Sequence, residues 1–134
     1  MGIYVQQQHF QEELEFNNIW ANPLKVPVEI LINERLVTIH FSTREAVQTI
    51  SAPNIIAYLP QYLEPIEGVT NFVMMVRDDT TQVFGHIRIA NDVVPDRITA
   101  VIQKSTGLPN DPFSGSGLGG FPRFEVTYIL KNTR

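Results

Sequence analysis

Hydrophobic and polar residues alternate most clearly in residues 69–90, where two apolar runs flank the polar segment 78–81. A period of two is typical of β-strands, and Asp and Thr suit the turn between them. The first run, however, sends apolar side chains to both faces of a strand. These are Phe72, Met74 and Val76 on one face and Val73 and Met75 on the other. We therefore predict a β-hairpin whose first strand needs cover on both faces.

A second hairpin is predicted over residues 26–41, with Asn33-Glu34 as its tight turn. The returning strand places His40 on its polar face. Residues 123–130 alternate in the same way, so we expect them to close the chain as a strand. In the hairpin over residues 26–41, the apolar face of the first strand comprises Val28, Ile30 and Ile32.

Two further regions carry helix signals. Ser42-Thr43-Arg44-Glu45 matches a capping box, in which the Ser and Glu side chains accept the free N–H groups of a helix start. Pro53 and Pro60 would limit that helix to two short pieces, residues 43–50 and 53–59. Pro95 and Gly107 mark the ends of a third helix, over residues 95–106. The β-branched run 98–102 leaves a strand open there.

We therefore predict an α+β fold, in which an antiparallel or mixed sheet of about five strands carries short helices. The sheet is built from the two hairpins and the C-terminal strand. An all-β sandwich is the alternative if residues 43–59 and 97–103 are strands. Residues 25–134 form the single domain, with a glycine-rich loop at 108–122. Residues 1–24 form an N-terminal arm, which either folds back on the domain or docks on a neighbouring subunit.

The arm and the glycine-rich loop supply the predicted interface. Five glycines and three prolines between Gly107 and Pro122 make ordering of the loop entropically costly. We expect the loop to be mobile in an isolated subunit and to become ordered on another chain or a ligand. The predicted interface residues are Tyr4, Phe10, Phe16 and Trp20 in the arm and Phe113, Leu118 and Phe121 in the loop.

The same loop contains the pattern G-x-G-x-x-G, in residues 115–120. A dinucleotide site requires a strand before this pattern and a helix after it, and here both flanks differ. Successive glycine N–H groups can still bind an anion, which is an alternative use of the loop.

Composition favours a soluble, intracellular interaction protein. Hydrophobic residues make up 43% of the 134-residue chain and charged residues 18%, a surplus of apolar surface that suits an interface. The net charge of −4 argues against nucleic acid and anionic membranes as partners. The lack of cysteine excludes disulfides, thiolate zinc sites and cysteine nucleophiles. Since the chain shows no signal peptide and no apolar stretch of about 18 residues, we expect no membrane span and a cytoplasmic location.

Two histidines form the alternative ligand site. His40-Phe41-Ser42-Thr43 and His86-Ile87-Arg88-Ile89 lie on two predicted strands. The pair resembles the two His-x-Thr/Ser-x motifs of the 2H phosphoesterases, whose histidines serve as general base and acid. The resemblance covers eight residues, and Arg88 stands where the second motif has a hydroxyl. It implies a phosphoester enzyme with His40, His86 and Arg88 at its site. No histidine has the spacing of a metal site, so we expect no metal.

No set of residues converges on a catalytic site, and we expect neither a catalytic residue nor a cofactor. We predict a non-catalytic structural or interaction protein that self-associates into a larger assembly. The alternatives are a small-ligand or phosphoester enzyme that uses His40 and His86 with the glycine-rich loop, and a module that binds a peptide at a sheet edge. The expected partners are further copies of the chain and possible other proteins.

Overall fold

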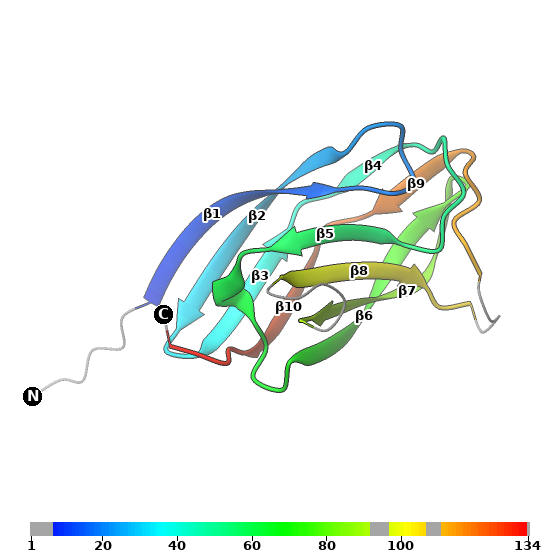
Figure 1. Ribbon diagram of the computed structural model, residues 1–134. Coiled ribbons are helices and arrows are strands. Elements are labelled where there is room, and N and C mark those ends of the chain that lie inside the picture. The colour runs from blue at the N-terminus through cyan, green and yellow to red at the C-terminus, as the bar shows by residue number, and fades with distance from the viewer. Residues whose placement is uncertain (1–6, 92–96, 107–110, 134) are drawn as a thin grey trace, which may run out of the picture.

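The computed structural model describes residues 7–91, 97–106 and 111–133, and its strands form two antiparallel sheets (Figure 1). The four-stranded sheet has the order β1 (Gln7–Phe16), β2 (Leu24–Asn33), β3 (Leu36–Phe41) and β10 (Phe124–Ile129). The six-stranded sheet has the order β4 (Arg44–Val47), β9 (Leu118–Phe121), β6 (Val69–Asp78), β7 (Thr81–Ala90), β8 (Ile98–Lys104) and β5 (Ile55–Leu59). A 3-10 turn, η1 (Gln61–Leu63), follows β5.

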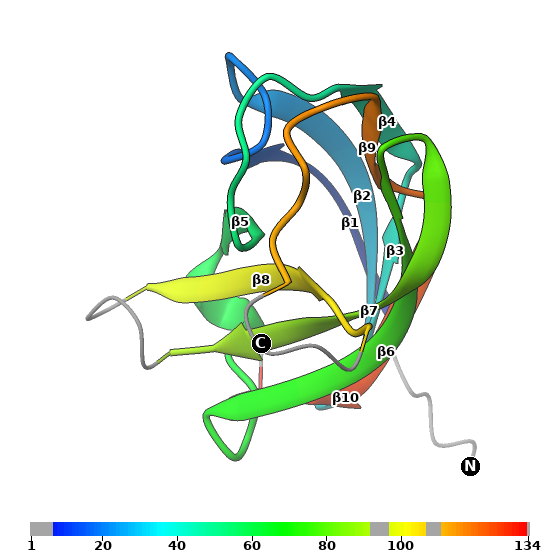
Figure 2. The ribbon, with the colours of Figure 1, turned by 90° about the vertical axis from the view of Figure 1, so that its right-hand side faces the viewer.

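The two sheets face each other and are joined along both sides. Figure 2 shows β5 and β8 to the left of β2 and β3, which belong to the other sheet. On one side, Asn17 and Ile56 pair through two backbone hydrogen bonds of 2.9 and 3.1 Å. On the other side, Pro65 pairs with Leu130. A single hydrophobic core lies between the sheets.

Each strand contributes its inward-facing residues to this core. Phe16 and Phe121 meet edge to face with ring centroids 5.1 Å apart, and Phe41 stacks on Phe124 at 4.5 Å. Phe16, Phe41 and Phe121 are fully buried. Burial of each such ring stabilises the fold by about 2 kcal/mol, so this aromatic cluster is a main link between β1, β3 and β9.

The central hairpin is confirmed, with β6 and β7 paired from Val69 and Ala90 to Asp78 and Thr81. Its turn residues, Asp79 and Thr80, have φ angles of 48° and 68°, as a tight hairpin turn requires. A β-branched residue adopts such an angle only when its surroundings impose it. The Thr80 N–H donates to the carbonyl of Leu118 at 2.9 Å, and the Leu118 N–H donates to Thr80 Oγ1 at 3.1 Å. The glycine-rich loop therefore holds the turn.

The second hairpin is also confirmed, as β2 and β3, and its turn lies at Glu34 and Arg35, one residue later than predicted. Residues 123–130 form β10 within that range, with Val126 and Tyr128 buried against the core.

The predicted helices are wrong, and with them the α+β class. Residues 44–47, 55–59 and 98–104 are strands β4, β5 and β8, and η1 is the only helical segment in the ranges that the structure describes. The fold is the all-β alternative. Glu45 does not cap a helix, because its carboxylate pairs with Arg77 Nε at 3.1 Å. In β8, Ile98–Ile102 is buried without interruption, and an apolar run of this length has no period that separates a helix from a strand.

The N-terminal arm is integrated into the four-stranded sheet from its first described residue. β1 pairs with β2 along its whole length, from Gln7 opposite Asn33 to Phe16 opposite Leu24. Leu14 and Phe16 face the core, while Glu13 and Glu15 face solvent. Residues 7–24 and the other described residues thus share one core.

Candidate functional site

Most residues of the predicted interface lie in the core of the single chain. Phe16, Trp20, Phe113 and Phe121 are buried, and Trp20 Nε1 donates to the carbonyl of Ala46 at 3.2 Å. Phe10 packs on Tyr62 with ring centroids 5.6 Å apart, and Leu118 is half-buried. Tyr4 lies outside the described residues. Four of the predicted interface residues are thus core residues, and Phe10 and Leu118 are partly exposed.

The glycine-rich loop packs on its own domain over residues 111–122. Phe113 forms a backbone bridge to Ala52, in which its N–H donates at 2.8 Å, and its carbonyl accepts from Ser51 Oγ at 2.9 Å. A Cβ on Gly119 would lie 2.4 Å from the Gln48 side chain, so this close approach requires glycine. The Gly115 N–H donates to Gln48 Oε1 at 3.1 Å. In residues 111–122 the chain itself thus supplies contacts for the loop, and ordering of the loop on another chain or a ligand stays a prediction.

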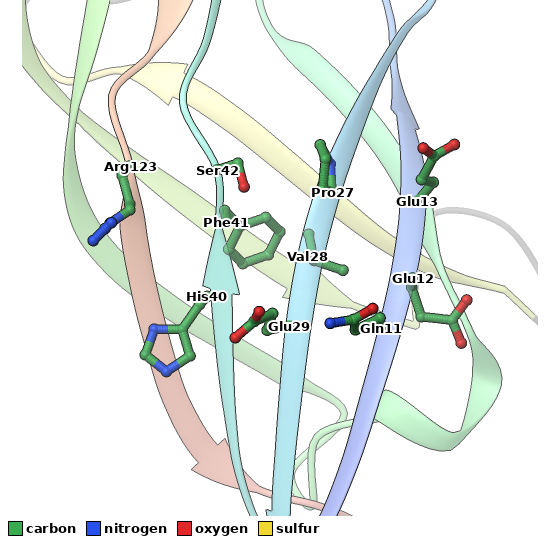
Figure 3. A pocket seen from close by; sticks show the side chains of 10 residues that line it. All are labelled: Gln11, Glu12, Glu13, Pro27, Val28, Glu29, His40, Phe41, Ser42 and Arg123. Atoms are coloured by element: carbon green, nitrogen blue, oxygen red, sulfur yellow. The ribbon is translucent and has the colours of Figure 1, made fainter.

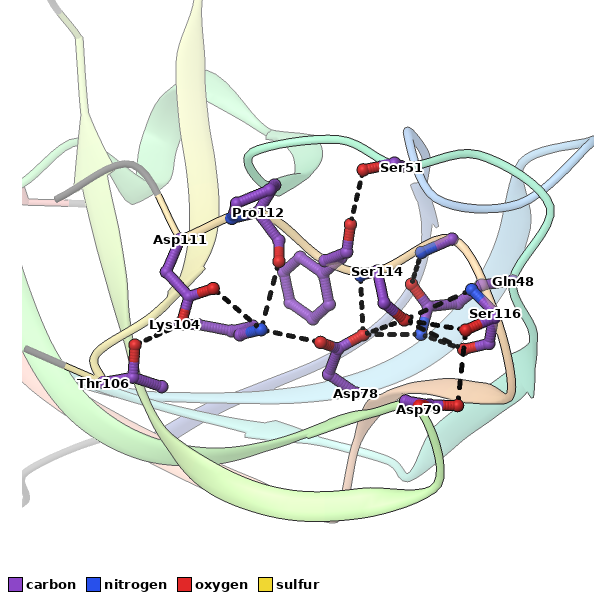
Figure 4. Close-up of polar contacts among 12 residues, drawn as sticks. Gln48, Ser51, Asp78, Asp79, Lys104, Thr106, Asp111, Pro112, Ser114 and Ser116 are labelled. Carbon is purple, nitrogen blue, oxygen red and sulfur yellow. Dashed lines mark hydrogen bonds and ion pairs between the residues drawn. The ribbon is translucent and has the colours of Figure 1, made fainter. Parts of the chain in front are cut away.

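A buried charged cluster fastens this loop to the central hairpin (Figure 4). Lys104 Nζ lies 2.6 Å from Asp78 Oδ2 and 3.3 Å from Asp111 Oδ1, and it also donates to the carbonyl of Pro112. The other carboxylate oxygen of Asp78 accepts from Gln48 Nε2 at 2.8 Å and from the Ser114 N–H at 2.9 Å. Asp78 and Lys104 are 8% and 9% exposed in their side chains. The cluster joins β6, β8 and the loop.

These contacts favour the charged forms of both partners. Burial raises the pKa of the Asp78 carboxyl, but hydrogen bonds from Lys104, Ser114 and Gln48 outweigh it and hold that pKa below its usual value of 3.8. Burial lowers the pKa of Lys104, but its bonds to Asp78 and Asp111 outweigh that effect and raise the pKa above 10.5. A charge pair satisfied on all sides by its own chain is a structural element and offers no site for a reactant.

The structure does not bring the two histidines together. His40 lies on the outer face of the four-stranded sheet, with Nδ1 3.0 Å from Glu125 Oε2. His86 lies on the outer face of the six-stranded sheet, between Ser105 Oγ at 2.6 Å and Gln103 Oε1 at 3.0 Å. Arg88 is on the same strand as His86. Because the hydrophobic core separates the two imidazoles, they cannot act as base and acid on one substrate.

The described ranges hold neither a metal cluster nor a membrane-spanning helix. In residues 7–91, 97–106 and 111–133, no three His, Cys, Asp or Glu side chains gather as metal ligands. Across the same ranges, no helix has the length and apolar character needed to cross a membrane.

The outer face of β6 and β7 exposes an apolar patch, formed by Val73, Met75 and Phe84 and called here the β6–β7 patch. Val73 is 80% exposed and Phe84 is 65% exposed. Met75 and Phe84 are direct cross-strand partners, and Val73 lies diagonally from Phe84, opposite His86. The described residues cover the inward face of β6, as the sequence pattern requires, but they leave Val73 exposed on its outward face and Phe84 exposed beside it on β7. The patch is therefore a candidate contact surface.

A groove lies on the outer face of the other sheet, over β1, β2 and β3 (Figure 3). Its volume is about 560 Å³. Three carboxylates and one arginine give it a negative character. Glu13 lies 3.9 Å from Lys25 and Glu29 lies 3.9 Å from His9, both across exposed side chains. The lining residues are Gln11, Glu12, Glu13, Pro27, Val28, Glu29, His40, Phe41, Ser42 and Arg123.

Sequence reasoning missed both surfaces as sites. The sequence did indicate Val73 and Met75, because β6 has apolar side chains on both faces and was therefore predicted to be covered on both. In the groove, sequence reasoning named only His40, as part of the alternative ligand site. The other lining residues gave no signal, because they come from positions up to 112 apart in the chain, from Gln11 to Arg123.

No family model and no curated protein matches the sequence. One solved structure with a similar fold is that of a reovirus attachment protein, sigma1, determined in complex with α-2,3-sialyllactose. The similarity has a TM-score of 0.56 and covers 96% of this chain and 67% of that chain, at 7% sequence identity. At this identity the likeness concerns the fold alone: the chain has a two-sheet β-fold similar to that of the attachment protein.

Proposed function

We propose that this chain is a non-catalytic interaction protein that self-associates into a larger assembly through the β6–β7 patch. The observation that carries the proposal is the exposure of Val73 and Phe84, at 80% and 65%, on a central strand pair of the larger sheet. Exposed apolar residues are normal when scattered singly, but neighbouring ones on a sheet face are typical of contact surfaces.

An apolar surface on a sheet face supports a protein as the partner of the patch. Sheet faces pack on one another through rows of apolar side chains, and a second copy of the chain is always present at equal concentration. The separation of the histidines and the internal use of the charged cluster leave the enzyme alternative without a converging site in the described residues.

A double substitution tests this proposal. Val73→Thr with Phe84→Thr keeps residues that favour strands but removes most of the apolar surface of the patch. We expect association to weaken by about 100-fold, because the loss of about 3 kcal/mol of apolar burial corresponds to two powers of ten in Kd. Sedimentation velocity over a range of concentrations measures this.

The control replaces two exposed apolar residues outside the patch by threonine. Val47 and Leu36 are 64% and 49% exposed and lie outside the patch. Val47→Thr with Leu36→Thr should therefore leave association unchanged. Equal effects of the two double substitutions would show that the patch has no special role.

Glycan recognition is a second candidate, favoured by the groove and by the likeness to an attachment protein solved with sialyllactose. The carboxylates of Glu13 and Glu29 would repel a sialylated ligand, so a neutral sugar such as lactose is the better probe. Titration of labelled chain with lactose and with sialyllactose, followed by amide NMR shifts at Glu29 and His40, tests this candidate. Shifts with neither sugar would contradict it.

A further inference from the structure

We infer that protonation of His86 weakens self-association through the β6–β7 patch, an inference that rests on the proposed function. His86 adjoins the patch on the same face, because it pairs with Val73 across the strands and follows Phe84 by two positions on β7. Histidine is the side chain that ordinarily changes its charge between about pH 5 and 8. The contact therefore forms at neutral pH and weakens in acid.

The hydrogen bonds of the imidazole fit both of its protonation states. Nε2 lies 3.0 Å from Gln103 Oε1, an amide oxygen that only accepts, so Nε2 carries a proton. Nδ1 lies 2.6 Å from Ser105 Oγ, a hydroxyl that can donate or accept. In the neutral imidazole Nδ1 accepts from this hydroxyl, and in the imidazolium Nδ1 donates to it. The fold of the single chain thus admits the charged form without the loss of a hydrogen bond.

No acidic side chain lies on this face of the three strands around His86. The outward positions of β6, β7 and β8 are free of Asp and Glu. The uncharged neighbours of His86 on β6 and β8 are Asn71, Val73, Met75, Val101, Gln103 and Ser105. The strands therefore supply no carboxylate to offset a positive charge on the imidazole.

The charged groups near His86 do not provide one either. Arg88, two positions further on β7, is itself a cation. Lys104 of β8 belongs to the buried charged cluster, where two carboxylates surround its ammonium group. Further along β6, Arg77 pairs with Glu45 at 3.1 Å. Water is thus the main stabiliser of the charged imidazole among the described residues.

Removal of this water couples the charge of His86 to association. In the single chain the imidazole is partly exposed, so its charged form is hydrated. A second copy that covers Val73 and Phe84 excludes water from the imidazole beside them, which penalises the charged form. A proton therefore binds more tightly to the free chain than to the assembly. Once His86 of the free chain is protonated, Kd rises about tenfold per further pH unit of acidification for each covered His86.

Sedimentation velocity at about pH 7.5 and about pH 5.5 tests this coupling across the titration range of histidine. For the native chain, we expect Kd to be about tenfold higher at the acidic pH. His86→Gln retains a neutral side chain that can donate and accept, so it should associate equally at both values. His86→Lys carries a permanent charge and should associate weakly at both. Retention of the full pH dependence in His86→Gln would overturn the inference.

The other two histidines of the chain provide the matched control. His9 and His40 lie on the outer face of the four-stranded sheet, near Glu29 and Glu125. The variant with His9→Gln and His40→Gln should keep the pH dependence of the native chain. Loss of that dependence in this variant would assign it to the wrong sheet for the inference. Thermal unfolding at both pH values shows whether each variant keeps its fold.

A second measurement requires no substitution of His86. NMR of the imidazole signals against pH gives the titration midpoint of His86 in the native chain. The midpoint should be lower in concentrated solution, where the chain is associated, than in dilute solution. Equal midpoints would contradict the inference even if every His86 variant failed to fold.

Failure of the inference can be distinguished from failure of the proposed function. A native chain that associates equally at both pH values overturns the inference and leaves self-association in place. Stronger association in acid does the same, and it would mean that the second copy sets a carboxylate against His86. A native chain that is monomeric at neutral pH and at every concentration contradicts both.

Discussion

The turn and the outer face of the central hairpin invert the usual distribution of side chains. At its turn, Asp78 is buried with Lys104, whereas along its outer face Val73 and Phe84 are exposed. The buried charges are satisfied by the chain's own loop, through Gln48 and Ser114. The exposed apolar groups of the patch have no cover from the described residues of the chain. The difference separates a structural role for the charged cluster from an interaction role for the patch.

The largest expected effect is on stability and comes from the charged cluster. Asp78→Asn removes the negative charge opposite Lys104, whose ammonium group is then buried with only Asp111 as its charged partner. We expect the free energy of unfolding in urea to fall by about 3 kcal/mol, the order found when one member of a buried pair is lost.

The adjacent residue provides the control for that substitution. Asp79 is exposed and lies in the same turn, and asparagine tolerates its positive φ angle. Asp79→Asn should change the free energy of unfolding by less than about 1 kcal/mol. A similar loss in both variants would mean that the turn, and not the buried pair, is what the substitutions disturb.

The pH dependence of stability sharpens the same comparison. The pKa of Asp78 is lowered in the folded state. The contribution of the ionised Asp78 carboxylate to the free energy of unfolding is therefore complete above the ordinary pKa of 3.8, and it is lost as pH falls through the lower pKa of the folded state. The native chain should therefore lose stability steeply below pH 3.8, and Asp78→Asn should have a shallower dependence there. Urea unfolding between acidic and neutral pH measures both curves, and parallel curves would refute the assignment.

The smallest expected effect is that of the histidines. His40 pairs with Glu125 between exposed side chains, and such pairs contribute less than about 1 kcal/mol. His40→Ala should therefore leave the unfolding midpoint and the oligomer mass nearly unchanged. His86→Ala, next to the patch, should alter association by only a few fold. A loss of any phosphoester-cleaving activity in either variant would revive the enzyme alternative.

The parts of the fold that sequence predicted are those defined by neighbouring residues. The two hairpins are read from local alternation and a turn, and both exist as β2–β3 and β6–β7. Strands β5 and β8 are neighbours in the sheet although Ala57 and its partner Ala100 are far apart in the chain. β4, which carries the capping box, likewise pairs with the distant strand β9. The capping box and the well-placed prolines are local helix signals that this long-range pairing overrides.

The charged cluster and the candidate surfaces were predicted less well than the hairpins, for a related reason. An aromatic residue in a glycine-rich loop gives the same pattern whether it packs on its own domain or on a partner, so Phe113 and Phe121 were assigned to an interface and are core residues. The buried pair of Asp78 and Lys104 joins residues 26 apart, with no periodic signal between them. Among the sequence patterns, only that of β6 pointed to a surface that the described residues leave exposed.

The molar mass of the native chain in solution tests the central claim most directly. Sedimentation equilibrium over a wide range of concentrations should give a mass that rises above the 15.2 kDa of the single chain. The rise should disappear in the variant with Val73→Thr and Phe84→Thr. A constant mass of 15.2 kDa up to the highest concentration, in the native chain, would contradict the account.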